Sequence, residues 1–183
     1  MDERLTEDLF VRQQGIVHQV AKLPHKILQF HDVDGLSQII LHELSHKPIF
    51  NLKKATYLVD NPDFDHLIGV AGFCCDECHH HKEDLWQMPH SFVTDMQNAT
   101  FHNDVKKFLK NSLRKKDINL NDSEDVIGLA HFLGMQDPGY FSWNMKHGNH
   151  GVLIFDKGEQ EFPDWKKQFL MNAAALLSFS PIY

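Results

Sequence analysis

The chain has 183 residues, of which 42% are hydrophobic and 23% are charged, and its formal net charge is −7. This length suits one domain, and this composition is ordinary for a soluble globular protein and excludes a disordered chain. The acidic balance argues against binding to duplex nucleic acid, and no apolar run approaches the ~20 residues of a membrane span, so we expect a cytoplasmic protein that does not enter the membrane.

The first part of the chain has the pattern of a helix, a short strand and a second helix, which cover residues 3–22, 27–30 and 36–46. Pro24 is expected to end the first helix, because the residue before a proline avoids helical geometry. Asp34 and Gly35 then supply a cap and a turn for the second helix.

Three further apolar runs predict strands, at residues 55–59, 67–73 and 151–155. Helical periodicity follows over residues 91–96, 103–114, 122–133 and 163–177. Alternation of strands and helices predicts a single α/β domain, residues 1–183, with a central, mostly parallel sheet of about four strands covered by helices; an α+β arrangement is the fallback.

Two carboxylates one residue apart follow the predicted strand 27–30, in the segment His31-Asp32-Val33-Asp34-Gly35. Alternate residues of an extended segment point the same way, so Asp32 and Asp34 can converge on a divalent cation such as Mn²⁺ or Mg²⁺, with His31 beside them. If the strands are parallel, residues after the next two strands join this site at the same sheet edge; these metal ligands are Asp60, Asp76, His79 and His80.

The stretch from Phe30 to Ser37, followed by an apolar helix, resembles the first motif of the DHH phosphoesterases, metal-dependent hydrolases of phosphodiesters and related phosphate compounds. Asp32 and Asp34 match the acidic pair of that motif. Its usual histidine falls where Phe30 stands, and His31 comes one position later.

Later residues extend this resemblance, which covers residues 27–81. Asp60 is similar to the second aspartate of the family, and residues 76–80 are similar to its Asp-His-His signature. The resemblance implies a metal-dependent hydrolase of a small phosphorylated substrate, with Mn²⁺ or Mg²⁺ as cofactor. The same Asp-x-Asp-Gly also resembles the first motif of haloacid-dehalogenase-like phosphatases, whose first aspartate is the nucleophile.

A second motif supports a different enzyme class, because residues 42–46 read His-Glu-Leu-Ser-His. Histidines four residues apart lie on one helical face, so His42 and His46 can both reach Zn²⁺ while Glu43 takes a proton from metal-bound water. The alternative function is therefore a zinc metallopeptidase.

Three cysteines, Cys74, Cys75 and Cys78, lie too close together for a disulfide framework and suit a reducing compartment. Cys75 and Cys78 form a C-x-x-C that, with the neighbouring imidazoles, could hold a structural Zn²⁺. The third hypothesis is accordingly a zinc-binding interaction module without catalytic activity.

Each of these motifs also has a purely structural interpretation. Asp34 can be a helix cap, Asp32 and Asp60 can be turn residues, and the run of histidines can be solvated surface, since loops that follow strands are rich in aspartate for reasons of turn geometry.

Overall fold

The computed structural model describes residues 3–31, 33, 35–47, 49–77, 85–113, 124–158 and 161–180, with the side chains of the first helix described from Phe10 onward, except Arg12. Five strands form one sheet in the order β3-β2-β1-β5-β4. Their bounds are β1 Lys54–Asn61, β2 His66–Cys74, β3 Leu109–Lys110, β4 Pro138–Asn144 and β5 His150–Asp156.

Every strand pair in this sheet is antiparallel, so the predicted mostly parallel sheet is wrong and the α+β fallback describes the fold. The reason is visible in the connections. Residues 62–65 join β1 to β2, and residues 145–149 join β4 to β5; both are too short for the crossover that parallel neighbours require.

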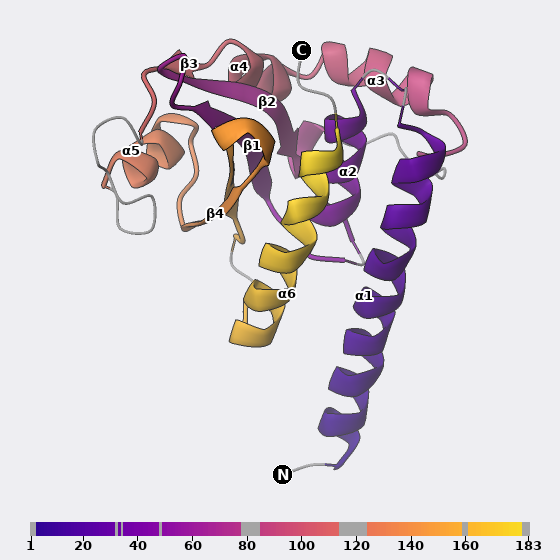
Figure 1. The fold of residues 1–183 in the computed structure, drawn as a ribbon. Coiled ribbons are helices and arrows are strands. Elements are labelled where there is room, and N and C mark those ends of the chain that lie inside the picture. The colour runs from indigo at the N-terminus through magenta and orange to yellow at the C-terminus, as the bar shows by residue number, and fades with distance from the viewer. Residues whose placement is uncertain are drawn as a thin grey trace.

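Helices cover both faces of the sheet (Figure 1). One face packs against α1 (Glu3–Gln29), α2 (Leu36–Ser45), α3 (Pro89–Gln97) and α6 (Asp164–Ala174), and a 3-10 turn at Ala175–Phe179 follows α6. The other face packs against α4 (Thr100–Lys106) and α5 (Glu124–Phe132). Short 3-10 segments lie at Cys75–Glu77 and Lys146–Gly148.

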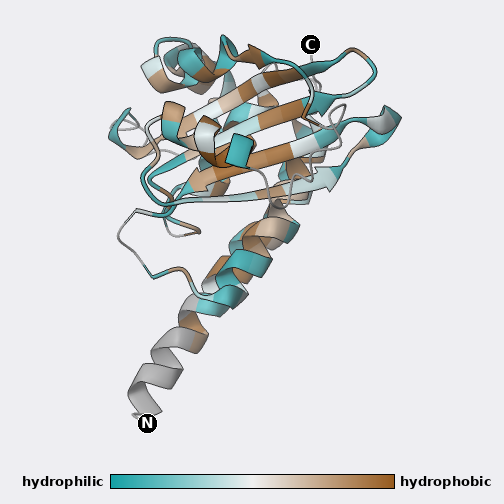
Figure 2. Cartoon of the chain, turned by 90° about the vertical axis from the view of Figure 1, so that its left-hand side faces the viewer, coloured by the Kyte–Doolittle hydropathy of each residue, from teal (hydrophilic) through white to brown (hydrophobic). Residues whose placement is uncertain are grey.

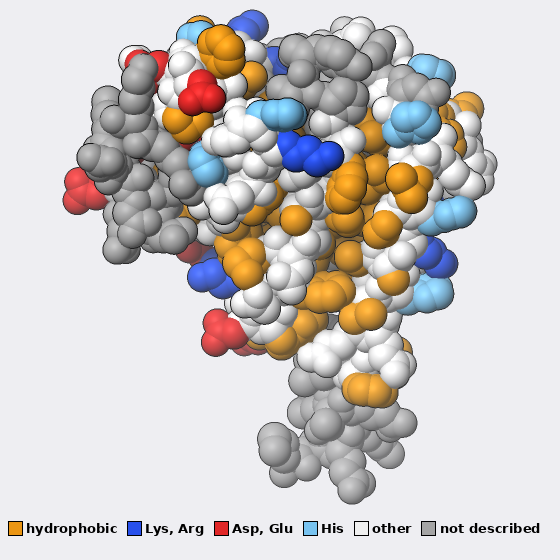
Figure 3. All heavy atoms as spheres, viewed as in Figure 1, with side chains coloured by type: hydrophobic (Ala, Val, Ile, Leu, Met, Phe, Trp, Pro, Cys, Tyr) orange, Lys and Arg blue, Asp and Glu red, His pale blue; other side chains and the backbone are white. Residues whose placement is uncertain are grey.

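The first helix differs most from its prediction, because α1 continues through Pro24 to Gln29 and the predicted strand 27–30 is its last turn. Apolar residues at helical spacing join this end to the core on that face of the sheet, where α1 contacts α2. Leu23 and Ile27 are buried, while Pro24 faces solvent. The N-terminal half of α1 extends away from the remaining elements (Figures 1 and 2). Figure 3 shows apolar side chains along α1 and on the neighbouring surface toward α6.

Helix α4 lies directly on the backbone of β2, at two glycines. A Cβ atom added to Gly69 would lie 1.7 Å from the carbonyl oxygen of Val105, and one added to Gly72 would lie 2.9 Å from a methyl group of the same valine. Only glycine permits this approach, so the sequence of β2 sets the height of α4 above the sheet.

Within the described part of the chain, no helix combines the length and the apolarity that crossing a membrane demands.

Candidate functional site

The residues proposed for a metal site at one sheet edge do not share an edge. Lys54 of β1 pairs with Cys74 of β2, whereas Asp60 pairs with Leu67, so Asp60 lies at the opposite end of the sheet from Cys75 to Glu77. Six residues of strand separate the two ends, which corresponds to about 20 Å. The predicted metal ligands could converge only if the strands were parallel. The other ligands of the predicted site, Asp32, Asp34, His79 and His80, lie outside the described residues, as does Cys78.

Asp60 is nevertheless an unusual residue. Its side chain is fully buried on the α4 and α5 face of β1, and neither carboxylate oxygen has a hydrogen-bond partner among the described residues. Asp156, equally buried on β5, accepts hydrogen bonds from the backbone N–H groups of Gln136 and Gly158, at 2.9 and 2.8 Å. A buried carboxylate without donors costs folding free energy, so Asp60 weakens the fold unless a ligand satisfies it.

The His-Glu-x-x-His segment lies at the C-terminal end of α2, where His46 is the extended residue that follows the helix, and the structure brings the two imidazoles together. The ring of His42 is stacked on that of His46, with centroids 5.4 Å apart and planes 13° apart. His42 is buried between the rings of Phe73 and Phe92, whose centroids lie 5.3 and 5.0 Å away. Stacked rings turn their faces toward each other, whereas a shared zinc needs ring nitrogens that converge on one point.

The two described cysteines, Cys74 and Cys75, are free thiols at the end of β2. Burial raises the pKa of Cys74. Burial, together with the adjacent Asp76 carboxylate, raises the pKa of Cys75 to about 11. The Cys75 thiol donates to Asp76 at 3.5 Å. Both thiols are therefore protonated at neutral pH and poorly suited to nucleophilic or redox chemistry.

Among residues whose placement the structure describes, no three His, Cys, Asp or Glu side chains gather as a possible metal site. The metal-dependent phosphoesterase and the zinc-binding module stay predictions, because several of their ligands fall in undescribed segments. The zinc peptidase also stays a prediction, since the sequence assigns no third ligand to join His42 and His46.

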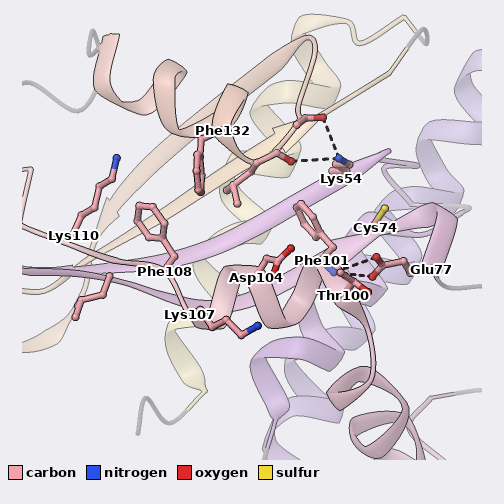
Figure 4. A pocket seen from close by; sticks show the side chains of 13 residues that line it. Lys54, Cys74, Glu77, Thr100, Phe101, Asp104, Lys107, Phe108, Lys110 and Phe132 are labelled. Carbon is pink, nitrogen blue, oxygen red and sulfur yellow. Dashed lines mark hydrogen bonds between the residues drawn. The ribbon is translucent and has the colours of Figure 1, made fainter.

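A cavity of about 760 Å³ lies instead at the start of β1, on the face that α4 and α5 cover. Its walls come from three places that are distant in the sequence: the ends of β1 and β2, the segment from α4 to β3, and the turn after α5 (Figure 4). Five apolar side chains line it, namely Phe101, Phe108, Leu109, Phe132 and Leu133.

The apolar lining has a buried floor and an exposed rim. Phe101 and Phe108 are 7% and 8% exposed, whereas Phe132 is 78% exposed. Phe132 extends the apolar lining from this buried floor to the mouth of the cavity.

Polar groups of the cavity are arranged around these rings. The Lys54 ammonium donates to the carbonyl oxygens of Leu133 and Gly134, at 3.3 and 3.1 Å, and lies 5.2 Å from the centre of the Phe101 ring. Glu77 accepts the backbone N–H of Phe101 through both oxygens, at 3.1 Å each, and so caps the start of α4.

The charges that remain at the cavity favour an anion. Asp104, Lys107 and Lys110 also line it, and all three are exposed. The Lys110 ammonium lies 5.5 Å from the centre of the Phe108 ring. Among the described lining residues, the three lysines, Lys54, Lys107 and Lys110, outnumber the two carboxylates, Glu77 and Asp104.

Behind the cavity, His102 ties α4 to the sheet and to α2. Its Nδ1 accepts the backbone N–H of Gly72 at 3.2 Å, so the ring proton is on Nε2, 3.0 Å from the side-chain amide of Gln38. This N–H can donate to Gln38 when the amide presents its oxygen to the ring. Burial, assisted by repulsion from Lys106, lowers the pKa of His102 to about 4. The imidazole is thus a neutral structural group at physiological pH.

Apart from Cys74, which belongs to the predicted cysteine cluster, the residues lining this cavity were not among the predicted ligands, because their relation is not local in the sequence. The available signal was the concentration of phenylalanine and lysine over residues 101–110, which was interpreted as part of a helix. Comparison with protein-family models and with curated proteins gave no match to the chain.

Proposed function

We propose that this protein binds a small amphipathic molecule, with a flat apolar body and an anionic group, in the cavity between α4, the start of β1 and the turn after α5. The observation that carries the proposal is a cavity of about 760 Å³ lined by one exposed and two buried phenylalanine rings and by three lysines. That volume is within the range of cavities that hold cofactors and metabolites.

The rings of the cavity suit a planar apolar body. Phe132, at the rim, would lose contact with water and gain contact with the ligand on binding. Such burial stabilises a complex by roughly 25 cal/mol per Å² of apolar surface. Aromatic rings pack in offset or edge-to-face geometries, and Phe108 supplies a second ring on the floor.

The lysines suit an anionic group. Lys107 and Lys110 are exposed at the mouth, so their ammonium groups can meet a carboxylate or phosphate without large desolvation. Lys54 is held by two backbone carbonyls and contributes its charge from the inner end.

Binding is favoured over catalysis because the thiol that could act as a nucleophile is protonated. Cys74 is the thiol that lines the cavity, and burial raises its pKa, so it is protonated at neutral pH. The described lining residues contain no histidine that could act as its base.

The test uses a fluorescent aromatic sulfonate, anilinonaphthalene sulfonate, as the probe in titrations of the native protein. We expect one saturable site, which Phe132→Ala weakens by about 10-fold because the truncated rim loses apolar contact. Phe64→Ala is the matched control, since Phe64 is 72% exposed in the turn between β1 and β2 and is not a lining residue of the cavity.

Absence of a saturable site in the folded protein would refute the proposal. Equal weakening by Phe132→Ala and Phe64→Ala would also refute it, because the probe would then be reporting general apolar surface.

Metal-dependent hydrolysis is the second proposal, and the observation in its favour is Asp60. A cation bound beside this carboxylate would supply the charge partner that the described residues do not provide. We expect Mn²⁺, Mg²⁺ or Zn²⁺ to raise the unfolding temperature of the wild type but not that of Asp60→Asn. No shift in the wild type with any of the three ions would end this proposal.

A further inference from the structure

The backbone holds the ammonium group of Lys54 in place at the wall of the ligand cavity. This half-buried lysine donates to the carbonyl oxygens of Leu133 and Gly134, and all three residues line the cavity (Figure 4). By contrast, Lys107 and Lys110 are exposed, and neither side chain forms a hydrogen bond or ion pair with another described residue. Lys54 is therefore the lining lysine whose position is set before a ligand arrives.

The two carbonyl groups that hold Lys54 belong to the turn in which α5 ends. The N–H groups of Gly134 and Met135 donate back to carbonyl groups of α5, at 2.9 and 3.0 Å, and Gly134 has a φ of +69°. This hydrogen-bond pattern ends many helices and favours glycine at the position with positive φ. A Cβ atom added to Gly134 would also lie 3.1 Å from the Lys54 ammonium, so glycine gives the lysine room to reach the turn.

The Lys54 ammonium group has one more donor than the turn uses. A lysine ammonium carries three N–H groups. Two are directed to the turn, and no described residue accepts a hydrogen bond from the third. The Phe101 ring, with its centre 5.2 Å away, attracts the positive charge without accepting a hydrogen bond at that distance. An oxygen placed in the cavity can therefore accept the third N–H.

The positive charge of Lys54 is also not neutralised by a carboxylate. Within the described part of the chain, no acidic side chain forms an ion pair with this lysine. Glu77 lines the same cavity, but both of its oxygens accept the backbone N–H of Phe101. The carbonyl groups of the turn carry only partial negative charge, so they position the ammonium group and leave its charge available. A hydrogen bond to such a charged, preorganised donor is stronger than one between neutral groups.

We propose that Lys54 determines the specificity of this cavity by donating its third N–H to an oxygen on the planar body of the ligand. The inference rests on the proposed function and adds a chemical class to it, an aromatic carbonyl compound whose anionic group lies toward Lys107 and Lys110. The oxygen belongs to the body because Lys54 lies beside the buried Phe101 ring, whereas the other two lysines lie at the mouth. A body without an acceptor would take water away from the Lys54 donor and leave it unsatisfied.

The test compares two anionic aromatic compounds of the same shape, anthraquinone sulfonate and anthracene sulfonate, with the sulfonate on the same outer-ring carbon. They share the planar three-ring body, and only the quinone has carbonyl oxygens. Each compound is titrated against the native protein with bound anilinonaphthalene sulfonate, and displacement of this probe gives its Kd. We expect the wild type to bind the quinone about 10-fold more tightly, as one hydrogen bond to a charged donor would produce.

Three variants then assign this preference to one residue. Lys54→Met keeps the apolar stem, removes the ammonium group and should abolish the preference for the quinone. Lys54→Gln should abolish it as well, because its two amide N–H groups can bond to the turn but leave no third donor. Lys107→Met is the matched control, since it removes the same charge at the mouth, and it should weaken both sulfonates alike and keep the preference.

The ratio of the two Kd values separates recognition by Lys54 from a purely structural role. A distorted cavity would weaken both compounds equally and leave the ratio unchanged, so an unchanged ratio in the Lys54 variants would overturn the inference. Equal affinity of the wild type for the two compounds would overturn it too. In both cases the proposed function would stand, because the compounds still displace the probe. Failure of both compounds to displace the probe from the wild type would refute the proposed function and the inference together.

Discussion

Protonation of His102 should control how the stability of the protein changes between pH 7 and pH 4. This imidazole is 3% exposed and is held between Gly72 of β2 and Gln38 of α2. Burial lowers its pKa from 6.5 to about 4. The unfolded chain therefore takes up a proton near pH 6.5, whereas the folded chain does so only near pH 4.

The direction of the effect follows from the order of these two pKa values. The stability that neutral His102 contributes is fully present above pH 6.5 and is lost as the pH falls toward 4, because protons bind the unfolded state first. Each pH unit between the two values removes about 1.4 kcal/mol from the unfolding free energy, so the loss is about 2 kcal/mol at pH 5 and about 3 kcal/mol at pH 4.

Urea unfolding at pH 7 and pH 5 measures this loss, for the wild type and for His102→Asn. Asparagine can still accept from the Gly72 N–H but does not titrate. The variant should be less stable than the wild type at pH 7, yet its loss between pH 7 and pH 5 should be smaller by about 2 kcal/mol. Equal losses in the two proteins would refute the argument, because every other titrating group is common to both.

Three further predictions concern single positions. Gly69→Ala should destabilise the protein by about 3 kcal/mol or more in urea unfolding, since its Cβ meets the Val105 carbonyl, whereas Gly128→Ala on α5, with nothing within 4 Å, should stabilise it by about 0.5–1 kcal/mol. Asp76→Asn should speed alkylation of the Cys75 thiol, followed by peptide mass spectrometry, and an unchanged rate would show that the carboxylate does not raise that pKa. In metal-free buffer, Asp60→Asn should raise the unfolding free energy by about 1–3 kcal/mol, and a lower value would mean that the carboxylate has a partner in solution.

The local sequence pattern was sufficient to predict several elements of the fold. The apolar runs at 55–59, 67–73 and 151–155 correspond to β1, β2 and β5, and the helix predicted at 36–46 corresponds to α2. These segments were identifiable because β-branched and apolar residues fill strand-length runs between turn residues.

Other elements were missed because their signals conflict. Ile27 to Phe30 is a strand-length apolar run, yet it continues the buried face of α1 past Pro24, and only its packing into the shared core beside α2 reveals this. Strand β4 begins at Pro138 and Gly139, residues typical of loops, and it is an edge strand where proline is tolerated.

The wrong strand direction was the error with the largest consequence for the predicted metal site. Pairing partners and their polarity are long-range properties, which short apolar runs do not encode. With an antiparallel sheet, Asp60 and Asp76 follow neighbouring strands in the sequence but lie at opposite ends in space. The cavity lining, by contrast, joins Lys54, Phe101 and Phe132, which no local motif connects.

The contact between α4 and β2 makes one wall of the proposed ligand cavity more rigid than the opposite wall. A helix that rests on a layer of side chains can shift by changing their rotamers, but above Gly69 there is no such layer, and backbone meets backbone. The wall that carries Phe101 and Phe108 is therefore fixed in position. Adjustment to ligands of different thickness therefore depends on the opposite wall, the turn from Phe132 to Gly134. Two hydrogen bonds from Lys54 hold this turn to the sheet.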